Sequence, residues 1–302
     1  MLLDEIRERV LKGDQRAIAR AATLVENRHA TQLLRELFPH TGKALVIGIT
    51  GAPGAGKSTF ASQLTRVLRA ESKRVGVIAV DPTSPYSGGA ILGDRIRMLE
   101  HYSDSGVFIR SMATRGWLGG LAPAAADMTV LFDAAGCDVI IVETVGVGQD
   151  EVEIAKLADV TLVVLTPNAG DDVQALKAGI MEIADVFVLN KSDLDGADKL
   201  ERELKASFTL SHRPDGWTPL VVRTVAGEGK GIAEALNAVR EYEATGLGKR
   251  KGGEVWAVRL REMLRERLLE RYDPTVFERA ARAVVNHETD PYTVIEELLG
   301  QQ

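Results

Sequence analysis

Residues 44 to 59 place a glycine-rich segment and a lysine–serine pair between an apolar run and a helical pattern. Gly51, Gly56, Lys57 and Ser58 fit the spacing G-x-x-x-x-G-K-S of a phosphate-binding loop, or P-loop. Its glycines let successive backbone N–H groups curve around a phosphate. The start of a helix adds further N–H donors and a positive dipole end. The stretch therefore predicts a nucleoside triphosphate site.

Each part of this loop has an expected task. Lys57 would reach the outer phosphates, and the Ser58 hydroxyl would bind Mg²⁺. The alternative is an ordinary glycine-rich turn, which the apolar run before it and the helical pattern after it disfavour. The residues expected to hold the nucleotide here are Gly51, Ala52, Pro53, Gly54, Ala55, Gly56, Lys57, Ser58 and Thr59.

A second motif, Asn190-Lys191-Ser192-Asp193, follows an apolar run and indicates which base is bound. A carboxylate at Asp193 can accept hydrogen bonds from guanine N1–H and from its exocyclic amine. Adenine has no matching donors, and a site left with an unpaired carboxylate rejects it. The backbone N–H groups of Val225 and Ala226 could close over the base edge. GTP is therefore favoured over ATP, with Asn190, Lys191 and Asp193 around guanine.

Two acidic residues stand where predicted strands end, Asp81 and Glu143. Mg²⁺ prefers hard oxygen ligands and keeps several waters, so Ser58 with nearby carboxylates would suffice. A helix cap or a solvated turn is the alternative for either acid alone. Gly146 could offer its N–H to the γ-phosphate, and a loop that senses this phosphate is a common basis for a GTP/GDP switch.

These residues need a sheet that brings strand ends together. Strands are predicted at 44–49, 75–80, 107–110, 138–142, 160–165, 185–189 and 219–223. Helices are predicted near 57–72, 121–135, 150–157, 171–183, 196–207 and 230–242. The alternation predicts an α/β fold, a P-loop NTPase whose mostly parallel sheet is covered by helices on both faces. Ligands are expected at the carboxyl ends of the strands.

Three parts are expected along the chain: a helical extension over 1–42, the P-loop GTPase domain over 43–244, and a linker with a helical arm over 245–302. Glycines at 245–253 suggest a flexible boundary. Beyond it an apolar stripe should pack on the core or on another subunit. Its residues are Trp256, Leu260, Met263, Leu264 and Leu268.

Composition and charge limit the classes of partner and the cellular compartment that are expected for this chain. The net charge of −6 gives no electrostatic footprint for nucleic acid. No apolar run is long enough to cross a bilayer, and the first residues are too charged for a secretory signal. Cys137 is the only cysteine, which suits a reducing compartment and a core position. A cytoplasmic protein that binds neither membrane nor nucleic acid is expected.

At several strings the chain resembles the MeaB/ArgK family, GTPases associated with methylmalonyl-CoA mutase and similar adenosylcobalamin-dependent acyl-CoA mutases. The matching strings are Gly51 to Thr59, Asp81 to Ser84, Ser87 to Met98, Ile109 to Gly116 with Gly119 and Gly120, Glu143 to Gln149, and Asn190 to Asp193. The string Gly-Gly-Ala-Ile-Leu-Gly-Asp-Arg-Ile-Arg-Met within 87–98 is the most specific of them.

The resemblance implies a GTP-hydrolysing chaperone that binds such a mutase and gates the loading and protection of its cofactor. It implies that Lys57, Asp94 and Glu143 are catalytic and that Asp81 and Asp94 join Ser58 and Glu143 around Mg²⁺. It also implies a homodimer formed through the C-terminal helices. Residues 166–177 match a third switch toward the partner; a strand-to-helix loop capped by Asp171 or Asp172 is the alternative.

Val147 follows Gly146, where better-known small GTPases carry glutamine, so slow basal hydrolysis stimulated by a partner is expected. Two other functions compete. A GTPase that inserts nickel or cobalt would need clustered soft or imidazole ligands, but there is one cysteine and the histidines are scattered. A P-loop kinase would need a base near the γ-phosphate, for which Asp94 is a candidate.

Overall fold

The computed structural model describes residues 3–81, 98–113, 122–144, 155–167, 180–210, 213–269 and 271–300. The chain divides into two compact units, Met1–Val255 and Trp256–Gln302. In the described part of the chain, no helix is both long and apolar enough to span a membrane.

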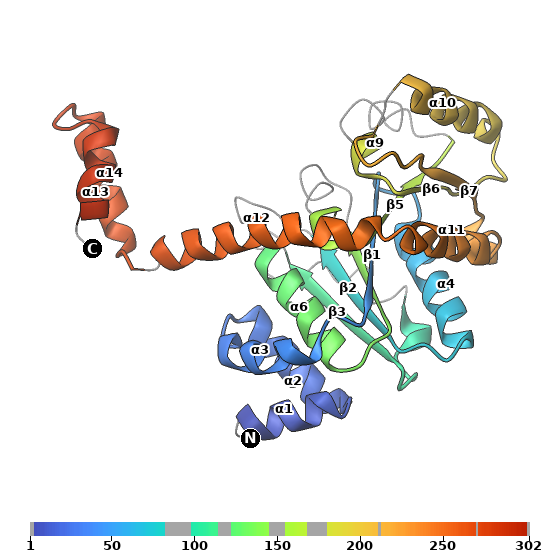
Figure 1. Ribbon diagram of the computed structural model, residues 1–302, viewed down its shortest axis with the longest axis horizontal. Helices are drawn as coiled ribbons and strands as arrows, with labels where there is room; N and C mark the ends of the chain where they lie inside the picture. The colour runs from blue at the N-terminus through green and yellow to red at the C-terminus, as the bar shows by residue number, and fades with distance from the viewer. Residues whose placement is uncertain are drawn as a thin grey trace. The chain divides into compact units, whose positions relative to one another are not determined.

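The first unit is built on a parallel sheet whose described strands run in the order β3-β2-β4-β1-β5-β6-β7 (Figure 1). The strands are β1 (Leu45–Gly51), β2 (Val75–Asp81), β3 (Val107–Ala113), β4 (Val139–Thr144), β5 (Val160–Leu165), β6 (Val186–Leu189) and β7 (Leu220–Arg223). All seven strands predicted from the sequence are present, within a few residues at their ends. Because every pair is parallel, the carboxyl ends meet at one edge, with β1 between β4 and β5.

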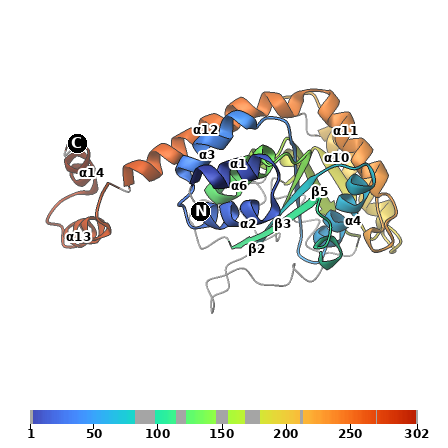
Figure 2. The ribbon, with the colours of Figure 1, turned by 90° about the horizontal axis from the view of Figure 1, so that it is seen from below.

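Alternate side chains along each strand pack against helices on opposite faces of the sheet. On one face, Ile47 and Ile49 of β1 belong to the same buried core as residues of α4 (Lys57–Ala70) and α11 (Ile232–Ala244). On the other, strand residues such as Ile140 and Val142 pack with α6 (Ala122–Ala134), and β5 and β6 pack with α10 (Ala197–Leu210). Figure 2 shows α4 and α6 on opposite sides of the strands. The predicted coverage of both faces is confirmed.

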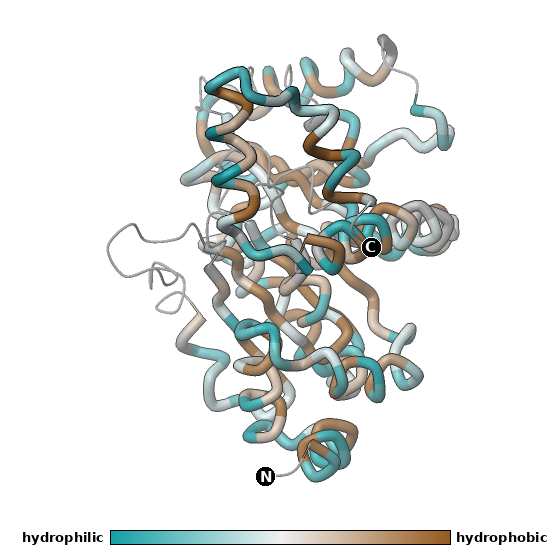
Figure 3. The backbone as a smooth tube through the Cα atoms, turned by 90° about the vertical axis from the view of Figure 1, so that its left-hand side faces the viewer, coloured by the Kyte–Doolittle hydropathy of each residue, from teal (hydrophilic) through white to brown (hydrophobic). Residues whose placement is uncertain are grey.

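Hydrophobic residues are concentrated along the strands, whereas the outer helices alternate between hydrophobic and hydrophilic residues (Figure 3). This alternation is typical of helices that cover a buried sheet on one side and face water on the other. Of the predicted helices near 150–157 and 171–183, only residues 155–157 and α9 (Ile180–Ile183) lie within the described residues.

The N-terminal helices α1 (Leu3–Leu11), α2 (Gln15–Glu26) and α3 (Thr31–Leu37), with the short η1 (Phe38–His40), pack in the same core as α6. Two polar contacts add to this apolar packing. Glu26 accepts two hydrogen bonds from Arg110 of β3, both at 2.5 Å. Asp133 of α6 accepts the backbone N–H groups of residues 42–44. The extension is therefore part of the first unit and anchored to its sheet.

The expected flexible boundary at 245–253 is instead a turn at Thr245 and Gly246 followed by the start of α12 (Leu247–Leu269). A Cβ atom at Gly248 would lie 2.4 Å from the carbonyl oxygen of Asp159, which precedes β5. Within the first unit, this glycine therefore permits the start of α12 to approach the Asp159 backbone closely, a use that sequence alone does not distinguish from flexibility.

The second unit contains the later part of α12, α13 (Pro274–Val285) and α14 (Pro291–Gly300). Asp273 caps α13 by accepting the N–H of Thr275 at 2.8 Å. The Tyr272 hydroxyl donates to the carbonyl of Leu298 at 2.6 Å and joins the last helix to the start of α13. Large apolar side chains on all three helices are exposed, including Trp256, Leu260, Met263, Leu264, Phe277, Tyr292, Ile295 and Leu299.

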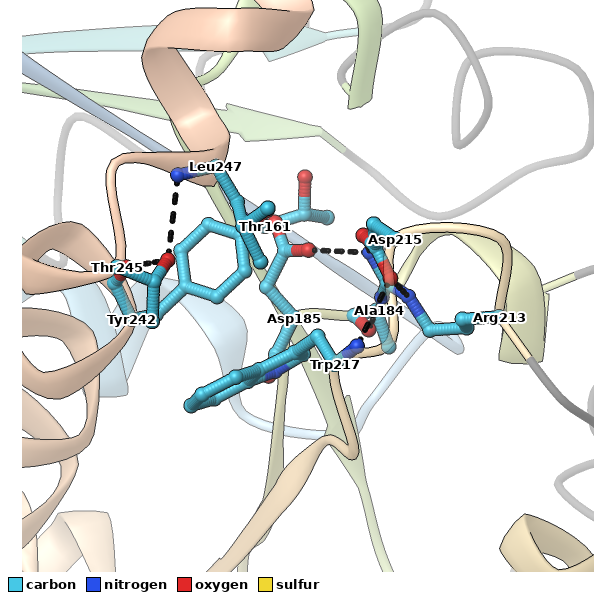
Figure 4. A network of polar contacts seen from close by, with 9 residues as sticks. All are labelled: Thr161, Ala184, Asp185, Arg213, Asp215, Trp217, Tyr242, Thr245 and Leu247. Carbon is cyan, nitrogen blue, oxygen red and sulfur yellow. Dashed lines mark hydrogen bonds and ion pairs between the residues drawn. The ribbon is translucent and has the colours of Figure 1, made fainter.

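A polar network braces the amino-terminal edge of the sheet, opposite the P-loop (Figure 4). Asp185, fully buried just before β6, accepts a hydrogen bond from Arg213 at 3.0 Å. Arg213 also pairs with Asp215 at 2.6 Å. Trp217 donates to the Asp185 carbonyl at 2.9 Å and packs edge-on against Tyr242 of α11. The network ties the loop before β7 and the end of α11 to β6.

Arg213→Met is expected to lower the free energy of unfolding by about 3 kcal/mol, because it removes the charged partner of a fully buried carboxylate. Urea unfolding with an unchanged slope measures this loss. Arg223→Met is the matched control, since Arg223 pairs with Asp198 and Glu201 at an exposed surface where ion pairs contribute little. Equal losses in the two variants would contradict the assigned role of burial.

Candidate functional site

The P-loop joins the central strand β1 to α4. Gly56 precedes the helix with φ 91°, a left-handed conformation that glycine adopts without strain. Lys57 is buried, and its ammonium group donates to the carbonyls of Gly51 at 2.7 Å and Ala52 at 2.9 Å. The lysine is thus held over its own loop. A phosphate oxygen would offer it a charged acceptor in place of neutral carbonyls.

Asn190, directly after β6, connects the P-loop to the loop after β7. Its side-chain amide donates to the carbonyl of Ala55 at 2.8 Å. Its oxygen accepts from the Thr224 hydroxyl at 3.1 Å and from the Ala226 N–H at 3.0 Å. Asn190 is only 2% exposed, so these three bonds replace water around the amide. One side chain therefore fixes both loops.

Gly56 makes room for this amide. A Cβ atom at Gly56 would lie 2.4 Å from Asn190 Nδ2, closer than nonbonded heavy atoms approach. Two features thus restrict position 56 to glycine: the positive φ of its backbone and the close approach of the Asn190 amide. Sequence indicates the first through the P-loop spacing but not the second, because Asn190 is distant along the chain.

Lys191 and the loop after β7 complete this edge of the sheet. Lys191 has φ 54°, and its ammonium group donates to the carbonyl of Gly54 at 3.0 Å. The N–H of Val225 donates to the Lys230 carbonyl, while that of Ala226 is used by Asn190. These two N–H groups, expected to face the base, are therefore engaged within the protein and brace the loop.

Asp193 is exposed at the same edge. Lys230 lies in its electrostatic neighbourhood, and the pKa of this lysine is raised, mainly by its hydrogen bond to Glu228 and to a smaller extent by Asp193. A carboxylate accepts hydrogen bonds, and this one is exposed, so Asp193 remains the predicted partner of the N–H donors of guanine.

Ser58 and Glu143 meet at the ends of α4 and β4. The Ser58 hydroxyl donates to Glu143 Oε1 at 2.6 Å, and both side chains are buried. One position along the strands, Thr144 donates to Thr50 of β1 at 3.2 Å. The pairing of β1 with β4 therefore brings the P-loop serine and the strand-end glutamate into contact, as their expected shared ligand requires.

The other expected metal and phosphate residues differ in what the structure describes. Asp81 ends β2, which pairs with β4 and so shares its carboxyl edge. Asp94 and Gly146, and most of the segment 166–177, lie outside the described residues. Among the residues that are described, no three histidine, cysteine, aspartate or glutamate side chains form a metal cluster.

Two buried threonines at this site, Thr50 and Thr224, were not predicted as site residues from the sequence. Thr224 holds the Asn190 oxygen, and Thr50 accepts from Thr144. Thr224 directly follows a strand and Thr50 lies within one, so their position at the binding edge was a usable signal. Their partners were not predictable, because the contacts depend on the order of strands in the sheet.

Cys137 is buried two residues before β4. Burial raises the pKa of its thiol from 9.0 to about 12. A thiol that stays protonated is a poor nucleophile. The cysteine is thus a core residue, as expected from the sequence, and not part of the site.

Comparison with known proteins gives a consistent picture. The family model described as methylmalonyl Co-A mutase-associated GTPase MeaB matches residues 18–275. A protein of Pyrococcus abyssi is 48% identical, covering 99% of this chain and 98% of its own. The GTPase ArgK of Escherichia coli is 42% identical over 80% of this chain and 76% of its own. A crystal structure described as an LAO/AO transport system kinase superposes with a TM-score of 0.72 at 30% identity, covering 99% of this chain and 96% of the other.

Gly56→Ala is expected to displace Asn190 and to lower the thermal unfolding midpoint of the nucleotide-free protein more than Gly54→Ala does. Both glycines have positive φ, but nothing lies within 4 Å of a Cβ atom at Gly54. The pair therefore separates backbone strain, present in both variants, from the clash with the amide. Calorimetry of the two variants measures the difference, and equal midpoints would show that Asn190 does not constrain this position.

Proposed function

This chain belongs to the MeaB family of methylmalonyl-CoA mutase-associated GTPases, and we propose that it is a GTP-hydrolysing chaperone of an adenosylcobalamin-dependent acyl-CoA mutase. The observation that most strongly supports the nucleotide-binding part of this proposal is the set of hydrogen bonds made by the Asn190 side chain, which we call the Asn190 bridge. It links the phosphate-binding loop to the loop beside Asp193 in a single buried contact set. Such a site would hold phosphates and guanine in a fixed relation, as a nucleotide switch needs.

The phosphates would lie against the P-loop. We assign Lys57 to the outer phosphates and the backbone of Gly51–Gly56 to the remaining oxygens. Lys57 already has carbonyl partners, so phosphate binding would exchange neutral acceptors for charged ones. Gly146 is assigned to the γ-phosphate on sequence grounds.

The residues at the ends of α4 and β4 fit Mg²⁺. A hydroxyl 2.6 Å from a buried carboxylate oxygen supplies hard oxygen donors beside the phosphate loop. Mg²⁺ keeps waters and phosphate oxygens among its ligands and so needs few protein groups. We assign Ser58 to bind it, with Glu143, Asp81 and Asp94 around it. The ion would neutralise charge on the phosphates during hydrolysis.

The small number of cations assigned to the phosphates favours a GTP hydrolysis rate that a partner can raise. Lys57 is the one cation assigned to the phosphates, and an added positive charge in the transition state gives large rate factors in phosphoryl transfer. We therefore propose slow basal hydrolysis that the mutase accelerates. A relative from mouse, 38% identical over 80% of this chain, is named for methylmalonic aciduria type A, which supports a partner of this class.

The partner is tested by hydrolysis assays with and without a purified methylmalonyl-CoA mutase. We expect a complex on gel filtration in the presence of a non-hydrolysable GTP analogue and a faster release of phosphate. Absence of both effects, with GTP binding demonstrated, would reject the mutase role while leaving the GTPase assignment intact.

Phosphate transfer to another molecule is the second candidate, because the related crystal structure is described as a transport system kinase. GTP labelled at the γ-phosphate separates the two reactions. Label recovered only as inorganic phosphate, in the presence of cell extract, supports hydrolysis. Label on a metabolite or protein would favour the kinase.

We further propose that the chain forms a homodimer through its C-terminal helices. Leu260 and Leu264 are 59% and 61% exposed one turn apart on α12, and further apolar side chains are exposed on α13 and α14. Exposed apolar surface of this kind marks an interface. Light scattering at micromolar concentration should give twice the chain mass, and Leu260→Glu with Leu264→Glu should give the monomer. A monomeric parent would reject the dimer.

Asp193→Asn is expected to weaken GTP and GDP binding by about tenfold to a hundredfold, because the base donors lose a charged acceptor. Titration of a fluorescent GDP analogue measures the affinity. Asp195→Asn is the control, since Asp195 is also exposed and lies two residues further along. Parent-like affinity in Asp193→Asn would mean that another group reads the base.

A further inference from the structure

Two serines one turn apart on α4 make matching hydrogen bonds to glutamates. Ser58 donates to Glu143 at 2.6 Å, and Ser62 donates to Glu100 at 2.7 Å. Positions four apart lie on the same face of a helix. The first bond belongs to the nucleotide site. The second joins the helix to η2 (Leu99–His101), which precedes β3.

His101 joins Ser62 and Glu100 in a small polar cluster, which we call the Ser62 latch: Ser62, Glu100 and His101. His101 Nε2 lies 3.0 Å from the Ser62 hydroxyl oxygen and 3.1 Å from the Ser62 carbonyl oxygen. A carbonyl can only accept, so Nε2 carries the hydrogen. This single N–H is shared between the carbonyl and hydroxyl oxygens of Ser62, while the hydroxyl donates to Glu100. Ser62 and His101 are buried, so this hydroxyl is satisfied without water.

Residues 98–104, which include η2, make a second contact with α4 further along the helix. Arg69, in the last turns of α4, donates to both carboxylate oxygens of Asp104 at 2.8 and 2.9 Å. Met98, at the start of the segment, is buried in the core that contains Phe60 of α4. Arg69 lies seven residues beyond Ser62, which is about 10 Å further from the P-loop.

We infer that the Ser62 latch positions Ser58 for Mg²⁺, an inference that rests on the proposed function. The apolar side of α4 fixes its approach to the sheet, while the latch fixes its rotation and height one turn from the phosphate loop. Nucleotide binding would exchange the carbonyl acceptors of Lys57 for phosphate oxygens, and the Ser58 hydroxyl oxygen would turn a lone pair toward the metal. The latch keeps the first turn in place during that exchange. Ser62, Glu100 and His101 are thus positioning residues.

The test compares Ser62→Ala with Asp104→Asn. Ser62→Ala removes the hydroxyl contacts with Glu100 and His101, and Asp104→Asn weakens the pair with Arg69 by removing its charge and one acceptor oxygen. Both variants loosen the hold of α4 on residues 98–104, but only Ser62 lies one turn from Ser58. The readout is the dissociation rate of a fluorescent GDP analogue across a Mg²⁺ titration, together with the thermal unfolding midpoint. We expect Ser62→Ala to need about threefold to tenfold more Mg²⁺ for half-maximal slowing of release. Asp104→Asn should lower the unfolding midpoint and leave the Mg²⁺ requirement at the parent value.

Two more variants complete the design. Ser62→Thr keeps the hydroxyl and should return the Mg²⁺ requirement to the parent value. If Ser62→Ala does not fold, Glu100→Ala, at a half-exposed side chain, removes the same acceptor and should raise the requirement in the same way.

The outcomes distinguish this inference from the function beneath it. A parent whose GDP release ignores Mg²⁺ would reject the metal assignment itself. A parent that responds to Mg²⁺, with Ser62→Ala indistinguishable from it, would overturn the latch alone. An equal rise in Ser62→Ala and Asp104→Asn would also overturn it, because that result reflects general loosening of the helix.

Discussion

The buried amide of Asn190 is the interaction on which the nucleotide edge depends. A buried amide that loses its partners costs free energy, so Ala55, Thr224 and Ala226 must all stay where the amide can reach them. The same amide excludes a side chain at Gly56. The shapes of the phosphate loop and of the loop beside the expected base reader are therefore set together.

The order of the strands makes this possible. β1 lies between β4 and β5, so the P-loop emerges beside Glu143 on one side and near the end of β5 on the other. A Cβ atom at Gly51 would meet the Val164 carbonyl oxygen of β5 at 2.1 Å, which shows how closely loop and sheet pack. β6, next to β5, then delivers Asn190 to the loop from the far side. Helices packed on both faces support this sheet. One of them, α4, also carries Lys57 and Ser58 in its first turn.

The sequence was sufficient for the local parts of this account. Apolar runs predicted the strands, and fixed spacings predicted the P-loop and the Asn190–Asp193 motif. Contacts between distant residues were not accessible: the Asn190 bridge, the Ser62 latch and the Arg213 network each join segments far apart in the chain. Glycine was ambiguous for the same reason, since Gly248 serves close packing where flexibility was expected. Local sequence patterns therefore predicted the chemistry that a residue can perform, whereas the order of the strands determines which distant residues it contacts.

Hydrogen–deuterium exchange of nucleotide-free Asn190→Ala tests the central claim most directly. If the Asn190 side chain holds both loops, backbone N–H exchange should become faster both in residues 51–59 and in residues 224–230. Peptides from β2 and β3 should exchange at the rate of the parent protein. Faster exchange in only one of the two loops, or in neither, would contradict the claim that one side chain sets the phosphate and base loops in common.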